Sequence, residues 1–284
     1  MKYLTRSLLF IASSSLLFAS CGSSNNNGQN EATKDAVQMP YPKIEITPVT
    51  NSPEFKEAEL SIKSVKSEKQ GRDSAKVNFE FALKNYELKN QTADAGGKMC
   101  NNSAKGQHIH FILDNGPYTA LYEPKNEVVL ANGTEHYLMA FLSRSYHESI
   151  KNKGAAVVYH FKIDEKGNLK KMEDPKTPML FYSRPKGDYF GKDTTNVLLD
   201  FYVWNTTLAA DGNKVMAAIS NPAIPNHDTA LTITNWQPYF IHNLGTGKCK
   251  ITLTLVDKDG KNIEGANTTA TRNFQLAAEE PIKK

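Results

Sequence analysis

Two histidines stand one residue apart in the stretch GQHIHFILDNGPY, which runs from Gly106 to Tyr118. The apolar alternation in HIHFILD predicts a strand, and alternate residues of a strand share one face, so His108 and His110 point the same way. Two imidazoles at this spacing, completed by one from an adjacent strand, can hold Zn or Cu. The alternative interpretation is that they form the solvated face of a sheet.

Three more histidines extend this pattern. His136 lies in EHYLMAFL, His160 in AVVYHFKI, and His147 in the intervening loop LSRSYHESIK. The strand CKITLTLVD has Cys249 and its alternate apolar residues pointing inward, and the same parity in EHYLMAFL directs Tyr137, Met139 and Phe141 into the core. His136 and His160 then face outward with His108 and His110. We expect His108, His110 and His136 as ligands, supported by His160 or His147, although a one-residue slip would reverse a strand.

A second group of polar residues surrounds a Pro and a Gly in FYSRPKGDYFG. Arg184 and Lys186, with Tyr182 and Tyr189, indicate a turn that offers cations and hydroxyl groups to an anionic or sugar-like ligand. Arg144, in the loop LSRSYHESIK, is a further candidate contact. The alternative is a loop whose basic residues pair with local acids.

Enzyme signatures are missing from the sequence. It has no GxSxG, no HExxH, no phosphate-binding loop and no glycine-rich dinucleotide turn. Asp114, Asp188 and Asp200 are expected in turns or at strand ends. We therefore predict a protein that binds without catalysis and has no cofactor, with Cu or Zn as the alternative. A hydrolase with a carboxylate pair brought together in space is a third hypothesis.

The second half of the chain repeats the first. VNFEFALKNYEL corresponds to VLLDFYVWNTTL, and AAVVYHFKID corresponds to NTTATRNFQL, each pair in the same order. Between them lie short alternating segments separated by turn residues, with no sustained helical period. Two similar units of about 100 residues predict an all-β protein with two tandem immunoglobulin-like β-sandwich domains. WQPYF, in the second unit, predicts a buried aromatic cluster.

The N-terminal segment resembles a lipoprotein signal. Lys2 and Arg6 precede an apolar run that is too short to span a membrane, and FAS precedes Cys21, the expected site of lipidation. The polar tail after Cys21 predicts a flexible tether. The expected organisation is a signal peptide, a tether, immunoglobulin-like domain 1, a linker, immunoglobulin-like domain 2 and a tail, at residues 1–20, 21–43, 44–164, 165–178, 179–278 and 279–284.

Charge argues against a nucleic-acid partner. The chain has 34 Lys and Arg residues and 30 Asp and Glu residues, and loss of the signal brings the two counts closer. Cys100 and Cys249 are the only cysteines besides Cys21. The repeat places them in different domains, so we expect no disulfide between them.

The stretches GQHIHFILDNGPY, AFLSRSYHESIK, FYSRPKGDYFG, LLDFYVWNTTL and WQPYF resemble a group of uncharacterised Bacteroidota-type lipoproteins, some of which are labelled phosphopeptide-binding protein. The resemblance covers most of the chain after the tether. It implies that Arg144, Arg184 and Lys186 contact phosphate.

These observations predict a binding or interaction protein of the bacterial cell envelope, anchored in a membrane through Cys21. We expect the outer membrane, on its periplasmic or its surface side. The partner is an unknown protein, glycan or phosphorylated ligand. The alternative function is the capture of Cu or Zn by the histidines of the first domain.

Overall fold

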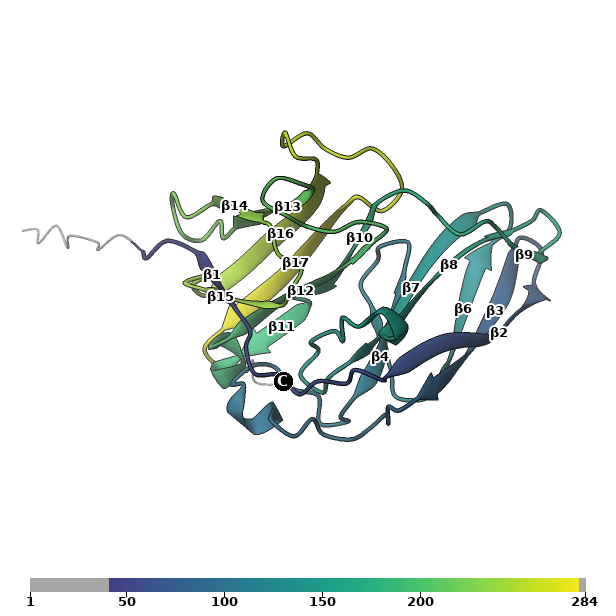
Figure 1. The fold of residues 1–284 in the computed structure, drawn as a ribbon, viewed down its shortest axis with the longest axis horizontal. Helices are drawn as coiled ribbons and strands as arrows, with labels where there is room; N and C mark the ends of the chain where they lie inside the picture. Colours follow the sequence, from purple (N-terminus) through teal and green to yellow (C-terminus); the bar gives the residue numbers. More distant parts are fainter. Residues whose placement is uncertain (1–40, 281–284) are drawn as a thin grey trace, which may run out of the picture. The chain divides into compact units, whose positions relative to one another are not determined.

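Two β-sandwiches follow one another along residues 41–280, the part of the chain that this computed structural model describes (Figure 1). The expected signal, Cys21 and most of the expected tether lie outside these residues. The described part contains no helix long and apolar enough to cross a membrane. Its helical segments are three short 3-10 turns, which are η1 (Ala95–Gly97), η2 (Lys153–Ala155) and η3 (Gly191–Thr194).

The first sandwich has sheets of three and five strands. In spatial order, the smaller sheet contains β2 (Glu59–Gln70), β3 (Ser74–Lys84) and β6 (Lys125–Ala131). The larger contains β5 (Thr119–Leu121), β4 (His108–Leu113), β7 (Glu135–Ser143), β8 (Ala156–Ile163) and β9 (Leu169–Lys171). Alternate residues of β3 fill the core, where the Phe79 ring lies edge-on to Phe111 and Phe161 at centroid distances of 5.2 and 5.7 Å.

The second sandwich has sheets of four and five strands. The first, in spatial order, contains β1 (Glu45–Pro48), β15 (Tyr239–His242), β12 (Val197–Trp204) and β10 (Met179–Arg184). The second contains β11 (Gly187–Phe190), β17 (Thr269–Ala277), β16 (Gly247–Val256), β13 (Lys214–Ser220) and β14 (Thr229–Ile233). Cys249, Ile251, Leu253 and Leu255 all point into its core, as the alternation of CKITLTLVD predicted.

Strand order in both units is immunoglobulin-like. One sheet contains the first, second and fifth strands of the repeat, which are β2, β3 and β6 or β10, β12 and β15. The other contains the third, sixth and seventh, which are β4, β7 and β8 or β13, β16 and β17. This division of strands between two sheets is that of an immunoglobulin-type sandwich, although β11 pairs in parallel with β17 at one edge. The predicted fold class is therefore confirmed.

Two short strands lie outside the expected domain boundaries. β1 falls within the range expected for domain 1, but it pairs with β15 of the second sandwich, as Figure 1 shows. β9 falls within the expected linker, but it pairs with β8 and extends the first sandwich. Both are too short for local periodicity to specify a pairing partner, which is decided by the sheet edge that each can reach.

The outer face of the first sandwich's larger sheet packs against β10 and β12. Nine buried side chains form this contact: Ile112, Tyr118, Met139, Phe141, Ala156, Val158, Met179, Phe181 and Tyr202. Because β7 is covered on both sides, its apolar pattern does not distinguish its faces. The predicted parity of this strand is wrong: Leu138, Ala140 and Leu142 enter the core of the first sandwich, whereas Met139 and Phe141 face the second.

Candidate metal site

Three of the five predicted histidine ligands meet at the beginning of β4. His108 and His110 occupy alternate positions of that strand, and His147 lies in the loop after β7. The Nε2 atoms of His108 and His110 are 2.9 Å apart, and Nε2 of His108 is 3.1 Å from Nδ1 of His147. One ring nitrogen from each residue lies within 4.8 Å of the other two. The cluster thus combines one strand and one loop.

The path of β7 explains why His147 reaches β4. The two strands are antiparallel, and Ser143, the last residue of β7, pairs with His108. The loop then turns tightly: the N–H of Arg144 donates to the carbonyl of Glu148, and the N–H of His147 donates to the carbonyl of Arg144. His147 has a φ of 70°, which residues other than glycine seldom adopt. This turn directs its ring back towards His108.

Burial keeps the three imidazoles neutral. His108 and His110 are fully buried, and His147 is 7% exposed. Loss of hydration lowers the pKa of His108 to about 4 and lowers the pKa values of His110 and His147 well below their usual range. The guanidinium of Arg184 acts in the same direction on all three. Since only a neutral imidazole has a lone pair for a metal, the cluster is suited to bind a cation near neutral pH.

Hydrogen bonds orient the two histidines of β4. Nδ1 of His108 lies 2.8 Å from the carbonyl oxygen of Gly106. A carbonyl only accepts, so Nδ1 carries the hydrogen and the lone pair of Nε2 faces the cluster. Nδ1 of His110 lies 2.9 Å from Oγ of Ser183, on β10 of the second sandwich. Ring nitrogens held in this way, by a partner on the side away from the cluster, are typical of metal-binding histidines.

Gly106 is required where it stands. Its φ is 81°, and a Cβ at this position would clash with the carbonyl of Lys89. The glycine therefore allows the backbone to approach closely and to present its carbonyl to His108.

Tyr118 completes the surroundings of the cluster. Its ring is stacked on that of His110, with centroids 3.6 Å apart and an interplanar angle of 7°. Its hydroxyl oxygen is 3.2 Å from Nδ1 of His147. Nζ of Lys186 lies 4.2 Å from the centroid of the Tyr118 ring. Because the His110 ring covers one face of Tyr118, Nζ lies over the opposite face. The phenol group is therefore fixed at the edge of the three-nitrogen cluster.

The structure does not bring His136 and His160 to this cluster. His136 shares a face of β7 with Leu138, so it lies on the core side, where Nδ1 is 2.6 Å from Oδ2 of Asp114. His160 does face outward, but it pairs with Tyr137, far along the sheet from His108. Its Nε2 is 2.7 Å from Oε1 of Glu135. The prediction of these two as ligands is wrong because it depended on strand parity and register.

The predicted cationic ligand contacts are buried. Arg144 forms an ion pair of 2.8 Å with Glu148 and donates to the carbonyl of Pro53. Arg184 donates to the hydroxyl of Tyr189 and to Oδ1 of Asn101, both at 2.9 Å. Both arginines are less than a tenth exposed. The expected exposed binding surface at these residues is therefore wrong.

The two tyrosines predicted as ligand contacts in FYSRPKGDYFG are also enclosed. Tyr182 and Tyr189 belong to the core of the second sandwich, and the guanidinium of Arg272 lies 5.1 Å from the Tyr182 ring centroid. Lys186 is half-buried, and its Nζ donates to the carbonyl of Tyr118. The stretch was interpreted as a loop, but its first part is β10, whose residues are all buried.

A buried ion pair fixes the loop after β7 to the second sandwich. Asp200 was expected in a turn or at a strand end, but it is fully buried in the middle of β12. Its carboxylate accepts hydrogen bonds from Nζ of Lys151 at 2.7 Å and from Oγ of Ser149 at 2.9 Å. Asp188 lies within β11, whereas Asp114 follows β4 in a turn as predicted. The ion pair therefore holds the segment that carries His147.

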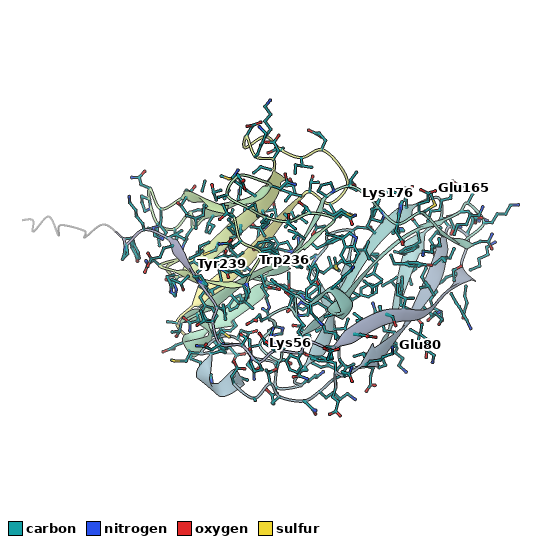
Figure 2. All side chains as sticks on the ribbon, viewed as in Figure 1. Lys56, Glu80, Glu165, Lys176, Trp236 and Tyr239 are labelled. Atoms are coloured by element: carbon teal, nitrogen blue, oxygen red, sulfur yellow. The ribbon has the colours of Figure 1, made fainter. Side chains whose placement is uncertain are left out.

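Two aromatic residues of WQPYF pack in the second sandwich: Tyr239 is buried as predicted, whereas Trp236 is only half-buried. Trp236 donates from Nε1 to the carbonyl of Phe201 at 3.1 Å and lies edge-on to Tyr202, with centroids 4.7 Å apart. Tyr239 is buried in the second sandwich, and Figure 2 shows both labelled side chains among its strands. Cys100 and Cys249 are also buried, as free thiols.

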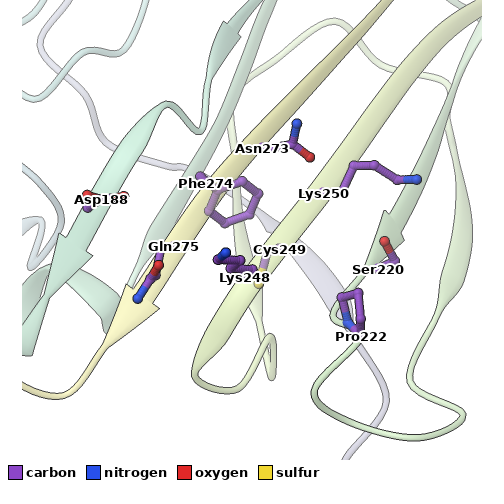
Figure 3. Close-up of a pocket in the computed structure, with 9 residues that line it drawn as sticks. All are labelled: Asp188, Ser220, Pro222, Lys248, Cys249, Lys250, Asn273, Phe274 and Gln275. Atoms are coloured by element: carbon purple, nitrogen blue, oxygen red, sulfur yellow. The ribbon is translucent and has the colours of Figure 1, made fainter.

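A hollow of about 510 Å³ lies on the second sandwich, away from the histidines. It is lined mainly by outward-facing side chains of β16 and β17, and Figure 3 shows Lys248, Lys250, Asn273 and Gln275 around it. It has no residue in common with the three-histidine cluster.

Sequence reasoning did not identify two residues that contact the cluster. Tyr118 lies within the same GQHIHFILDNGPY stretch as the histidines, so its proximity along the chain was a usable signal. Ser183 is 73 residues from His110, and no local pattern indicates their contact.

Comparisons with known proteins do not identify a family. No protein-family model matches the sequence. A search of curated proteins also finds no match. Among solved structures, the chain is similar to fibronectin(III)-like modules of Clostridium thermocellum CbhA, with a TM-score of 0.26 and 10% identity, over 77% of this chain and 94% of that one. It is also similar to a structure of the receptor tyrosine kinase Torso, with a TM-score of 0.19 and 15% identity, over 82% and 76% of the two chains. Both TM-scores are low, so the immunoglobulin-like description rests on strand order.

Proposed function

We propose that this chain binds one copper or zinc ion through His108, His110 and His147. The observation that supports the proposal is the convergence of three buried ring nitrogens, with separations of 2.9 and 3.1 Å between neighbours. Two nitrogens that each lie about 2.0–2.1 Å from one ion are about 3 Å apart. The His108–His110 and His108–His147 pairs therefore already have the spacing that one ion requires.

The chemistry of the surroundings favours the same proposal. The imidazoles are neutral near pH 7, because burial lowers their pKa values. The Gly106 carbonyl keeps the lone pair of His108 Nε2 directed at the cluster. Without an ion, this lone pair must be satisfied by hydrogens from His110 and His147, and the metal-free alternative is such a hydrogen-bonded network.

The proposal keeps the expected setting of the protein. We propose that Cys21 is lipidated and holds the two sandwiches at a bacterial envelope membrane, where the site takes up the ion. The phosphorylated or sugar-like ligand expected at Arg144, Arg184 and Lys186 is not part of the proposal, because the two guanidinium groups are engaged inside the protein.

Metal titration of the purified full chain tests the proposal. We expect one Cu or Zn ion per chain. At 100 times the dissociation constant, binding adds about 2.7 kcal/mol to the free energy of unfolding. The melting temperature should then rise by roughly 5–10 °C.

Two variants show whether the melting shift depends on the three-histidine cluster. His147→Asn removes one ligand and keeps a residue that tolerates the positive φ, so it should lose the melting shift. His160→Ala, at a histidine on the same sheet but outside the cluster, should retain it. An equal shift in both variants, or no ion in the wild-type chain, would reject the site.

A further inference from the structure

Three imidazoles leave a metal ion short of both ligands and negative charge. The rings of His108, His110 and His147 contribute no charge, and the cations of Arg184 and Lys186 lie against the neighbouring Tyr118 ring. Among residues 41–280, no carboxylate forms a hydrogen bond or ion pair with these three rings. A divalent ion in this buried place needs an anionic partner, since an uncompensated buried charge is costly.

Tyr118 is the oxygen donor best placed to meet that need. Its hydroxyl oxygen lies 3.2 Å from Nδ1 of His147, one of the three ligand nitrogens. Its ring cannot swing away, because the His110 ring is stacked on one face at 3.6 Å and Lys186 Nζ lies over the other at 4.2 Å. The other tyrosine near the cluster, Tyr122, has its hydroxyl 2.6 Å from Oγ of Ser103.

The spacing of two of the three nitrogen pairs favours copper(II) over tetrahedral zinc. Neighbouring nitrogens 2.9 and 3.1 Å apart, each about 2.0–2.1 Å from one ion, subtend about 90–100° at that ion. Tetrahedral ligands at the same bond length would be about 3.3 Å apart. Angles near 90° with nitrogen and oxygen ligands are typical of copper(II) in a tetragonal site.

We propose that the phenol oxygen of Tyr118 is the fourth ligand and that the ion is copper(II), an inference that rests on the proposed three-histidine site. On binding, the O–H bond of Tyr118 breaks, the oxygen forms a bond to copper, and the proton passes to the solvent. No electron is transferred. The site then has three neutral nitrogens and one phenolate, and Lys186 and Arg184 beside the Tyr118 ring stabilise the added negative charge.

Copper(II) titration of the full chain, followed by visible absorption, tests this assignment. A phenolate bound to copper(II) gives a ligand-to-metal charge-transfer band that imidazole ligands alone do not give. We expect the wild-type chain to develop the band as one equivalent of copper(II) binds. Calorimetry in two buffers of different ionisation enthalpy should show one proton released per ion.

Two conservative variants separate the possible outcomes. Tyr118→Phe should still bind copper(II), more weakly, with neither the band nor the proton release. Tyr122→Phe, the matched control with a ring 5.1 Å from that of His108, should behave as the wild type. A band that persists in Tyr118→Phe would overturn the assignment.

The wild-type chain also tests the inference without any variant. Copper(II) that binds through the histidines with neither band nor proton release would reject Tyr118 as a ligand and leave the three-histidine site intact. A wild-type chain that binds no copper(II) and no zinc would reject both proposals. The inference can therefore still be refuted with the wild-type chain if a variant fails to fold.

Discussion

Lowering the pH should destabilise the metal-free chain at pH values well above those at which carboxylates titrate. His108, His110 and His147 are buried as neutral imidazoles, with the pKa of His108 lowered to about 4 and the pKa values of the other two lowered well below their usual range. In the unfolded chain each returns to about 6.5. Between these limits the unfolded state binds more protons than the folded state, so the free energy of unfolding falls as pH falls.

The size of the effect follows from the number of buried rings. One histidine that must stay neutral costs about 1.4 kcal/mol per pH unit below 6.5, or about 2 kcal/mol at pH 5. His108, with its folded pKa of about 4, therefore costs about 2 kcal/mol at pH 5, a large part of the roughly 5–15 kcal/mol that is typical of a domain, and His110 and His147 change the stability in the same direction. The loss begins near pH 6.5 and, for His108, ends near its folded pKa of about 4.

Urea unfolding of the chelator-treated chain between pH 7.5 and pH 5 measures this loss. The slope of the free energy of unfolding against pH should approach the uptake of three protons on unfolding in the wild-type chain and of two in His147→Asn. A free energy of unfolding that stays constant between pH 7 and pH 5 would refute the neutral, buried cluster.

Three further substitutions test the framework around the site. Gly106→Ala should destabilise the chain by about 1–3 kcal/mol, because it strains a positive φ and displaces the carbonyl that orients His108; unchanged thermal stability would contradict this. Asp200→Asn should cost about 3 kcal/mol in urea unfolding, since it breaks a buried ion pair, whereas Glu80→Gln, in an exposed pair, should cost less than about 1 kcal/mol. Equal losses would show that burial does not matter there. Ile44→Ala should cost about 2–4 kcal/mol, because this residue beside β1 is buried in the core of the second sandwich; a loss of less than about 0.5 kcal/mol would indicate that β1 is dispensable.

Local patterns were sufficient for the strands in which polar residues interrupt the apolar run. CKITLTLVD, HIHFILD and AVVYHFKI alternate clearly, and their core-facing residues were predicted with the correct parity. The turn residues between them have the left-handed conformations that Asn and Gly tolerate, as at Asn115 with a φ of 52°. Because alternation and turn chemistry act over a few residues, the sequence by itself determined an all-β fold of two immunoglobulin-like units, and it placed His108 and His110 on one outward face.

Only the tertiary structure decided which residues meet them there. β7 is apolar on both faces because the second sandwich covers it, so its pattern fits either parity and His136 was assigned to the wrong face. The same contact buries β10, which turns Arg184 from an expected ligand contact into an internal donor and brings Ser183 to His110. The register of β7 against β4 brings the loop with His147 to the cluster. These outcomes depend on pairing and packing between distant segments, which residue order does not reveal without the folded chain.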